Sequence, residues 1–272
     1  MVSKTLNINH KNGVTYITFP KLEQTGAVRH LFSTRIGGVS TGQFSSMSTR
    51  FTGDDYDTVC ENYRILCSTV GIDTKNLVLS HQTHTSNVKV VDRSHCGAGY
   101  NKPPFSDIDG LITAERGVAL VTQYADCTPL LFCDPVKKVC ATSHAGWRGT
   151  AAKIGAVTVE KMVSEFGCRR EDIIAAIGPA ICKDCYEVDT PVYDAFIKNS
   201  VPLRDVFFPL GDGIHFNLDL KRANLNILLE SGIKQENIDV ADICTCCNSD
   251  TLHSHRATGG KRGNLAAIIE LI

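Results

Sequence analysis

Short apolar runs alternate with polar turns along the chain, and their spacing predicts a mixture of strands and helices. Runs rich in β-branched residues and bounded by Gly, Pro, Asn or Asp are typical of strands. Asp109–Thr113 and Val118–Thr122 are expected to form one strand pair. The remaining strands are expected at Val14–Phe19, His30–Thr34, Leu77–Leu79, Val88–Val91, Leu130–Cys133, Val139–Ser143, Ile173–Ile177, Val240–Ile243 and Leu265–Ile272.

Apolar residues with helical spacing indicate helices in other parts of the chain. We expect them at Asp57–Val70, Ala151–Phe166, Thr190–Lys198 and Leu218–Ser231, the last capped by Asn217. No repeat, low-complexity tract or linker divides the sequence. The pattern therefore predicts a single α+β domain spanning residues 1–272, with the polar residues 1–11 disordered and residues 95–106 forming an exposed loop.

Two of the predicted strands, Leu130–Cys133 and Val139–Ser143, are separated by turn residues and form a predicted β-hairpin. Cys127 precedes the first strand and His144 follows the second. Antiparallel pairing therefore brings the two side chains to the same end of the hairpin.

The residues after His144 strengthen this end of the hairpin as a candidate site. Gly146 and Gly149 let the backbone approach a ligand closely, and Thr150 is suited to cap the following helix. Between the glycines lie Arg148 and Trp147, the only tryptophan of the chain.

Composition narrows the choice of function and compartment. The 28 basic and 29 acidic residues nearly cancel, which argues against nucleic acid or an anionic membrane as a partner. No apolar run approaches the roughly 18 residues of a membrane span, and residues 1–11 do not resemble a signal peptide. The chain has 12 cysteines. Because several lie in apolar runs (Cys60, Cys67, Cys133 and Cys140), we expect reduced thiols and a cytoplasmic protein.

Two further segments carry candidate ligands. Arg35 precedes a loop with three glycines, Gly37, Gly38 and Gly42, which suits an anion, although a solvated surface turn fits the spacing equally well. His81 and His84 point to opposite sides of an extended segment, so they are not expected to bind one metal together. A hydrogen-bonded structural role is common for such a histidine, unless a Cys–His site elsewhere needs a third ligand.

Two CxxC pairs, Cys182–Cys185 and Cys244–Cys247, are alternative metal ligands. Together they match a four-thiolate zinc site in residue type, but two predicted helices separate them. Cys244 and Cys247 also match a small zinc knuckle with His253 and His255. We expect both pairs to be reduced and free of metal.

Several sequence blocks resemble those of the YfiH, or laccase-domain, family, which is also described as a multicopper polyphenol oxidase or purine nucleoside phosphorylase family. The blocks are Arg35–Ser40, Gln82–His84, Ala125–Pro129, His144–Gly149, Gly178–Pro179, Tyr186–Val188 and Asn217–Leu220. The resemblance implies a single-domain α/β sandwich with mixed sheets flanked by helices, similar to the catalytic domain of cytotoxic necrotizing factors.

The resemblance also implies a mononuclear zinc held by His84, Cys127 and His144. Members of the family are described as acting on purine nucleosides, by phosphorolysis of adenosine, inosine and methylthioadenosine and by deamination of adenosine. An older label is copper-dependent phenol oxidation, which makes copper the alternative cofactor. The chain departs from the family where His253-Ser254-His255-Arg256 replaces a Phe-Ser-Tyr-Arg type of block.

Two imidazoles and one thiolate leave the fourth tetrahedral position of zinc open, as in catalytic sites. Such a zinc ion can activate water for attack on C6 of a purine. Phosphorolysis also needs an anion pocket, for which Arg35, Arg148 and Arg256 are candidates. Asp126 is a candidate proton carrier or a support for Cys127. The expected substrates are a purine nucleoside and phosphate.

Three alternatives remain open at this point. A laccase needs many histidine ligands, and nine histidines with one HxH motif supply few. A Cys–His hydrolase or deamidase would use Cys127 as nucleophile and His144 as base, with no need for His84. A non-enzymatic zinc protein would close the fourth position. The sequence leaves the oligomeric state open between monomer and homodimer.

Overall fold

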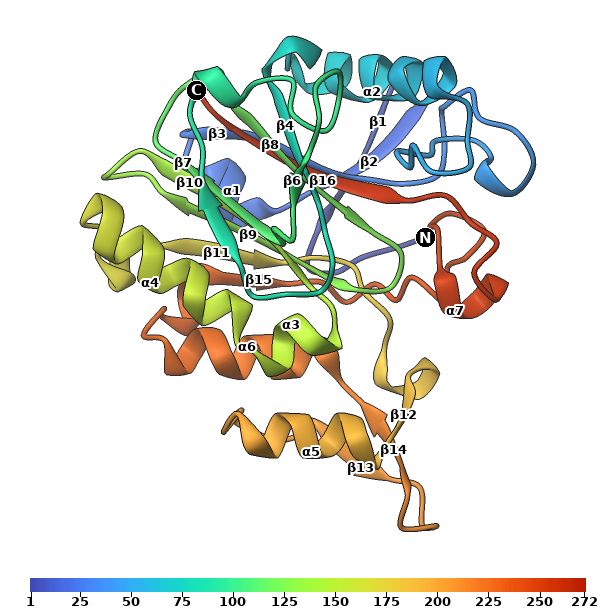
Figure 1. Ribbon diagram of the computed structural model, residues 1–272, viewed down its shortest axis with the longest axis vertical. Coiled ribbons are helices and arrows are strands. Elements are labelled where there is room, and N and C mark those ends of the chain that lie inside the picture. Colours follow the sequence, from blue (N-terminus) through green and yellow to red (C-terminus); the bar gives the residue numbers. More distant parts are fainter.

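Two β-sheets pack face to face, and helices cover their outer faces (Figure 1). The computed structural model describes residues 1–272. The seven-stranded sheet contains, in spatial order, β1 (Asn7–Lys11), β2 (Val14–Thr18), β3 (Val28–Ser33), β16 (Leu265–Leu271), β8 (Ala119–Tyr124), β4 (Leu77–His81) and β6 (Phe105–Ser106). The six-stranded sheet contains β15 (Ile238–Val240), β11 (Ile174–Ile177), β9 (Thr128–Asp134), β10 (Val139–Ala145), β7 (Gly110–Thr113) and β5 (Val88–Val90).

A smaller three-stranded sheet lies beside this sandwich. It orders β12 (Glu187–Asp189), β14 (His215–Leu218) and β13 (Phe207–Pro209). The helices are α1 (Pro20–Gln24), α2 (Tyr56–Val70), α3 (Trp147–Ala151), α4 (Ile154–Phe166), α5 (Thr190–Lys198), α6 (Leu220–Glu230) and α7 (His255–Thr258). In Figure 1, α2 covers the seven-stranded sheet, α4 and α6 cover the six-stranded sheet, and α5 lies against the small sheet. The mixed sheets and flanking helices confirm the predicted fold class.

The central strands are apolar throughout because both of their faces are buried. On β9, Leu130 and Phe132 pack with the helices, whereas Leu131 and Cys133 face the other sheet. β16 alternates in the same way between the space under α2 and the space between the sheets. The unbroken apolar runs in the sequence therefore mark the middle of a sandwich.

The helix boundaries follow local capping chemistry with two departures from expectation. The side chain of Asp55 accepts a hydrogen bond from the amide of Thr58 at the start of α2, and Gly71 ends that helix with φ of 74°. The helix expected from Ala151 to Phe166 is divided, because Lys153 has φ of 55° and separates α3 from α4. Asp219, not Asn217, caps α6.

Two predictions about strands are wrong. β7 and β8 do not pair with each other: β7 pairs with β10 and β5, whereas β8 pairs with β16 and β4 in the other sheet. The segment 7–11, expected to be disordered, forms β1 and pairs along its length with β2. Its residues are exposed or half-buried, so no alternating apolar pattern marks this strand in the sequence.

Two strand pairings position the functional residues. The antiparallel pair β9–β10 brings the residues before Thr128 and after Ser143 together at one end. The parallel pair β11–β15 brings the segments that follow these two strands to a shared edge. No helix is both long enough and apolar enough to cross a membrane.

Candidate metal centre

Three side chains from separate segments converge at the open end of the β9–β10 hairpin. His144 lies opposite Pro129 in the hairpin register, one residue from the pairing of Ala145 with Thr128, so Cys127 lies close by. His84 joins them from the loop after β4. One ligand atom from each of the three lies within 4.8 Å of the others, and the Sγ of Cys127 is 3.9 Å from Nε2 of His84.

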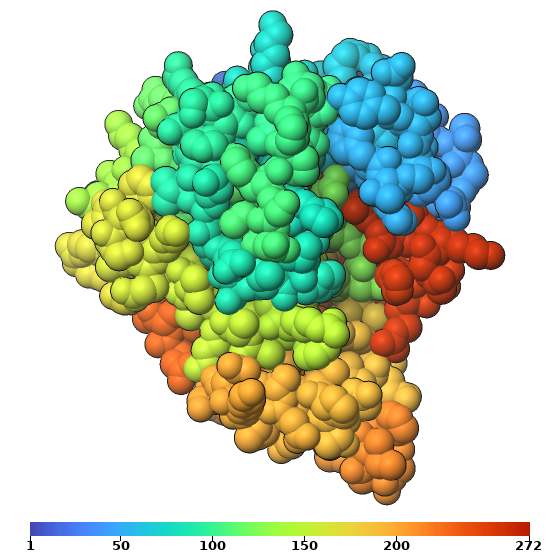
Figure 2. Space-filling model, viewed as in Figure 1, coloured from blue at the N-terminus to red at the C-terminus, as the bar shows by residue number.

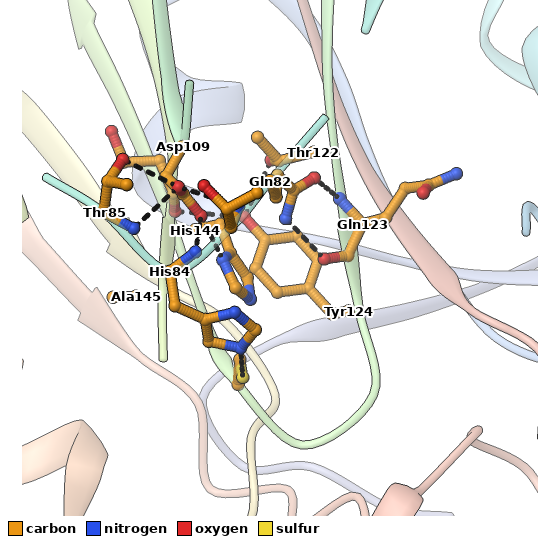
Figure 3. Close-up of polar contacts among 12 residues, drawn as sticks. Gln82, His84, Thr85, Asp109, Thr122, Gln123, Tyr124, His144 and Ala145 are labelled. Carbon is orange, nitrogen blue, oxygen red and sulfur yellow. Dashed lines mark hydrogen bonds and ion pairs between the residues drawn. The ribbon is translucent and has the colours of Figure 1, made fainter. Parts of the chain in front are cut away.

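The carboxylate of Asp109, at the start of β7, holds both histidines in place (Figure 3). Its Oδ1 accepts a hydrogen bond from Nδ1 of His144 at 2.8 Å and from the amide of His84 at 3.1 Å. Its Oδ2 accepts from the amides of Thr83 and Thr85 and from the Thr85 hydroxyl. Because Nδ1 of His144 is occupied by Asp109, Nε2 is left to bind a ligand.

The loop that carries His84 is anchored to β8 by a two-pronged amide contact. The side chain of Gln82 donates to the carbonyl of Gln123 at 2.9 Å and accepts from its amide at 2.8 Å (Figure 3). His84 itself has φ of 66°, a left-handed conformation that is unfavourable for a histidine. Strained residues of this kind collect at functional sites when the surrounding contacts impose them, as Gln82 and Asp109 do here.

The electrostatics favour an ionised thiol. Burial opposes ionisation of Cys127, but the rings of His144 and His84 outweigh it and lower the pKa of Cys127 to about 6. Burial would also lower the pKa of His144, yet the Cys127 sulfur and the Asp109 carboxylate raise it to about 9. Around neutral pH the metal-free site therefore holds a thiolate beside an imidazolium.

This donor set fits a zinc ion. One thiolate and two imidazoles are ordinary zinc ligands, and three of them leave one tetrahedral position for water or substrate. Because residue 146 is a glycine, the space beside two of these ligands stays free of a side chain. A Cβ atom at this position would lie 2.6 Å from Cδ2 of His84 and 3.1 Å from Sγ of Cys127. His84, Cys127 and His144 are thus the residues that would hold the metal.

Two cavities meet at His84 and Cys127, and His144 lines the first of them. One, of about 340 Å³, is lined by polar groups that include Arg50, Gln82, Gln123 and Asn264. The other, of about 370 Å³, is lined by the aromatic side chains of Trp147 and Tyr186 and by three arginines, Arg148, Arg256 and Arg262. His84, Ala125, Cys127 and Arg262 line both cavities. Figure 2 shows a hollow between the teal segment near residue 80 and the red segment after residue 250.

The arginines predicted from sequence separate into two groups. Arg148 and Arg256 line the aromatic cavity, where their guanidinium groups lie over the rings of Trp147 and Tyr186, 4.2 and 5.2 Å from the ring centroids. Arg35 does not line either cavity. Its guanidinium donates to the carbonyls of Ser45 and Ser249, so it fastens two loops together.

Asp126 lies next to the site but is fully engaged with other groups. Its carboxylate accepts hydrogen bonds from the hydroxyl of Thr245 at 2.6 Å and from the amide of Arg256 at 2.7 Å. With φ of 91° it also bends the chain into Cys127. These contacts favour the supporting role over that of a proton carrier.

Sequence reasoning missed three residues of the site. Asp109 was assigned only as the first residue of a strand, and Arg50 and Arg262 lie in segments without a recognisable pattern. Arg262 has a buried Nε with no hydrogen-bond partner, and Arg50 donates to the carbonyl of Arg262 at 3.2 Å. An arginine that lines both cavities, beside a second arginine in one of them, is suited to bind an anion.

The structure also overturns the expectation that the two CxxC pairs lie apart. The sulfur atoms of Cys182, Cys185, Cys244 and Cys247 lie within 4.8 Å of one another. His253 does not join them, since it is buried and its Nε2 lies 3.3 Å from the carbonyl of Met47. All twelve cysteines are free of disulfide bonds.

Comparison with known proteins gives a consistent picture. Residues 29–272 match the family model described as multi-copper polyphenol oxidoreductase laccase. The chain is 35% identical to "Purine nucleoside phosphorylase YlmD" of Bacillus subtilis (strain 168), over 88% of this chain and 86% of that protein. It is 32% identical to "Adenosine deaminase RL5" of an unknown prokaryotic organism, over 78% and 82% of the two chains.

The fold agrees with these relatives. The crystal structure of YlmD from Geobacillus stearothermophilus superposes with a TM-score of 0.91 at 31% identity, covering 98% of each chain. The resemblance inferred from the sequence blocks is therefore confirmed, and it extends over nearly the whole chain. This chain belongs to the laccase-domain family, whose model is described as multi-copper polyphenol oxidoreductase laccase.

Proposed function

We propose that this protein is a zinc-dependent purine nucleoside phosphorylase that acts on adenosine, inosine and methylthioadenosine, with adenosine deamination as a second activity. The observation that carries the proposal is the convergence of His84, Cys127 and His144, of which His84 and Cys127 line both cavities. The names of the relatives, a phosphorylase and a deaminase, support the same two reactions. A metal bound there would supply Lewis acidity at the junction of the cavities.

The aromatic cavity is the better place for the purine base. The rings of Trp147 and Tyr186 offer apolar faces, and each carries an arginine over it. A planar heterocycle binds between such groups by stacking, with the guanidinium fork of Arg148 available for its nitrogen and oxygen atoms. The fork of Arg256 donates to the carbonyls of Cys185 and Glu187, so this residue contributes its position over the Tyr186 ring. The apolar side chains of Ile181 and Leu220 line the same cavity.

The polar cavity is the better place for phosphate. Arg50 and Arg262 both line it, so two guanidinium groups border the same space. Guanidinium groups bind phosphate oxygens two at a time, which gives both charge and orientation. Arg148 and Arg256 remain candidates for substrate binding on the other side, whereas Arg35 is engaged elsewhere.

This arrangement puts the two reactants on opposite sides of the sugar. A phosphate oxygen forms a bond to C1′ as the bond from C1′ to the purine nitrogen breaks. The base leaves with the electron pair and takes up the proton that hydrogen phosphate gives up. The protein then contributes mainly by holding phosphate and nucleoside in line and excluding water from C1′. Asp109 maintains the orientation of His84 and His144 throughout.

Two alternatives make different demands on the same residues. A multicopper oxidase needs several histidine-rich centres, but His84, Cys127 and His144 are the only histidine-containing ligand cluster in the structure. A Cys–His hydrolase is favoured by one observation, the lowered pKa of Cys127 beside His144. That enzyme would remain active after metal removal.

The test is an assay of inosine and adenosine with and without phosphate, on protein as purified, after chelation and after zinc is restored. We expect hypoxanthine release from inosine only with phosphate, inosine formation from adenosine without it, and loss of both after chelation. Phosphate-independent, chelator-resistant cleavage with a covalent adduct on Cys127 would support the hydrolase. Phenol oxidation upon copper loading, with no cleavage of nucleosides, would support the oxidase.

A further inference from the structure

The two CxxC pairs form a compact cluster of sulfur atoms outside the candidate metal centre. Cys185 Sγ lies 3.5 Å from Cys247 Sγ, and Cys182 Sγ lies 3.9 Å from the same atom. Cys244 completes the cluster, with all four sulfurs within 4.8 Å of one another. We call this set the tetracysteine cluster.

The fold explains why residues so distant in the sequence meet. Cys182 follows β11 and Cys244 follows β15, and these are neighbouring parallel strands. The carboxyl ends of parallel strands lie at the same edge of a sheet, so both CxxC turns emerge side by side. The pairing continues past the strands as a bridge between Ala180 and Cys244. The helices α5 and α6 lie between the two CxxC turns in the sequence, but they do not keep the turns apart in space.

The distances match a tetrahedral metal site better than a disulfide. A bonded sulfur pair is about 2.05 Å apart. Four thiolates at about 2.3 Å from a zinc ion lie roughly 3.8 Å from one another. The sulfur pairs at 3.5 and 3.9 Å fall close to that spacing.

The backbone around the cluster also stabilises ionised sulfur. The amide of Cys182 donates to the sulfur of Cys244 at 3.2 Å, and the amide of Cys247 donates to the same sulfur at 3.4 Å. Hydrogen bonds from backbone amides to thiolates are the outer contacts that hold ligands of metal sites in position. Lys221 donates to the carbonyls of Ala241 and Ile243 and so fixes the approach to Cys244.

We propose that Cys182, Cys185, Cys244 and Cys247 bind a second, structural zinc ion. Four protein ligands close the coordination sphere, so this ion is assigned no reaction. Its effect is to clamp the two loops that follow β11 and β15.

Both loops contact residues that line the aromatic cavity. The carbonyl of Cys185 accepts a hydrogen bond from Arg256 at 3.3 Å, and Tyr186 follows it in the aromatic cavity. Thr245, beside Cys244, donates to the carboxylate of Asp126. The structural ion therefore fixes one wall of that cavity without lining it.

The first experiment measures zinc per chain in purified wild type and in two matched variants. We expect two equivalents in wild type, one in Cys247→Ser and two in Cys246→Ser. Cys247 is the exposed member of the cluster, and Cys246 is its half-buried neighbour in the sequence, which is not one of the four. A Cys247→Ser variant that keeps as much zinc as wild type would overturn the proposal.

The second experiment does not depend on altering the cluster. In the double variant His84→Ala, Cys127→Ala the other centre is removed and all four cluster cysteines remain. X-ray absorption of its bound zinc should show sulfur ligands alone, at about 2.3 Å. Absence of zinc in this variant, nitrogen ligands, or a disulfide within the cluster under reducing purification would contradict the assignment. Whether this variant binds zinc or not, the result does not bear on the proposed activity, which belongs to the His84 site.

Discussion

A single carboxylate, that of Asp109, organises the candidate metal centre. It binds the ring of His144 and the backbone of His84, so it sets the orientation of two of the three ligands. Burial opposes its ionisation, but His144 and the Thr85 contacts keep the pKa of Asp109 below its usual range. The site therefore depends on a residue that does not reach the metal itself.

We predict that Asp109→Asn weakens zinc binding at this site by about 10- to 100-fold, as loss of an outer hydrogen-bond partner commonly does. The amide presents an NH₂ group where His144 needs an acceptor. Competition with a metal-sensitive dye measures the affinity. Asp107→Asn is the matched control, because Asp107 is exposed and contacts the hydroxyl of Thr83 instead. Equal zinc affinities in the two variants would show that Asp109 does not support the metal ligands.

A second prediction at this scale concerns phosphate. Arg50→Ala should raise the phosphate concentration needed for half-maximal phosphorolysis by about tenfold or more, since a charge-assisted contact contributes roughly 1.5–3 kcal/mol. Deamination of adenosine, which uses no phosphate, should change little. Steady-state kinetics of both reactions measure the difference, with Arg64→Ala, an exposed arginine paired with Glu61, as the control. A parallel loss of both activities would show that Arg50 acts on the fold.

Individual residues were predictable from sequence where a local pattern carried them. Cys127 and His144 followed from the hairpin register, which a turn between two apolar runs fixes. Asp109, Arg50 and Arg262 were not predictable, because their roles depend on which strands become neighbours and on which loops fold over the site. For Arg35 the glycine-rich loop fitted an anion site and a surface turn equally well, and in the structure the guanidinium donates to two backbone carbonyls.

At the level of elements, the hairpin and the short helix α3 meet at Gly146. This residue caps α3 with an ordinary φ of −69°, so the backbone itself does not require glycine. The requirement comes from the space beside the ligands, since a Cβ would lie 2.6 Å from the ring of His84. Real Cβ contacts are not this short, so the histidine would have to shift.

We therefore predict that Gly146→Ala lowers zinc occupancy of the His84 site while the metal-free protein unfolds at nearly the wild-type temperature. Replacing a glycine cap by alanine costs at most about 1 kcal/mol, whereas a displaced ligand affects binding directly. Metal content after dialysis and thermal unfolding of the metal-free form are the two measurements. A large drop in unfolding temperature with normal zinc content would reverse the interpretation.

The positions of strands and helices were easier to predict than the pairing of the strands. Most strands and helices fall within a few residues of their expected positions because apolar periodicity and glycine stops are local signals. Pairing is not local: β7 and β8 are close in sequence yet belong to different sheets. The same holds for the tetracysteine cluster. Its two halves are far apart in the sequence, and the non-local parallel pair β11–β15 brings them together.

The whole molecule carries a pH dependence that originates away from the site. His30 lies between α1 and the sheet, where its Nε2 accepts a hydrogen bond from the amide of Phe19 at 2.9 Å. Burial, only partly opposed by that backbone contact, lowers the pKa of His30 from 6.5 to about 4. Burial and the charge of Arg35 likewise lower the pKa of His253, to about 3.

These histidines should destabilise the fold in acid. Between pH 6.5 and 4 the unfolded chain protonates His30 and the folded chain does not, so stability falls as pH falls. The slope approaches about 1.4 kcal/mol per pH unit for each such histidine. Urea unfolding of wild type and His30→Gln measures it. The variant keeps an acceptor for Phe19 without a proton to gain, so its slope should be smaller; identical slopes would exclude His30 as a source.

The most direct test of the proposed activity follows ribose 1-phosphate formation from inosine by phosphorus NMR. We expect zinc-loaded wild type to form it in a one-to-one ratio with hypoxanthine, and Cys127→Ala to form none under the same conditions. Hypoxanthine without ribose 1-phosphate would indicate hydrolysis instead of phosphorolysis. No product from wild type at any phosphate concentration, or equal product from Cys127→Ala, would contradict a phosphorylase centred on His84, Cys127 and His144.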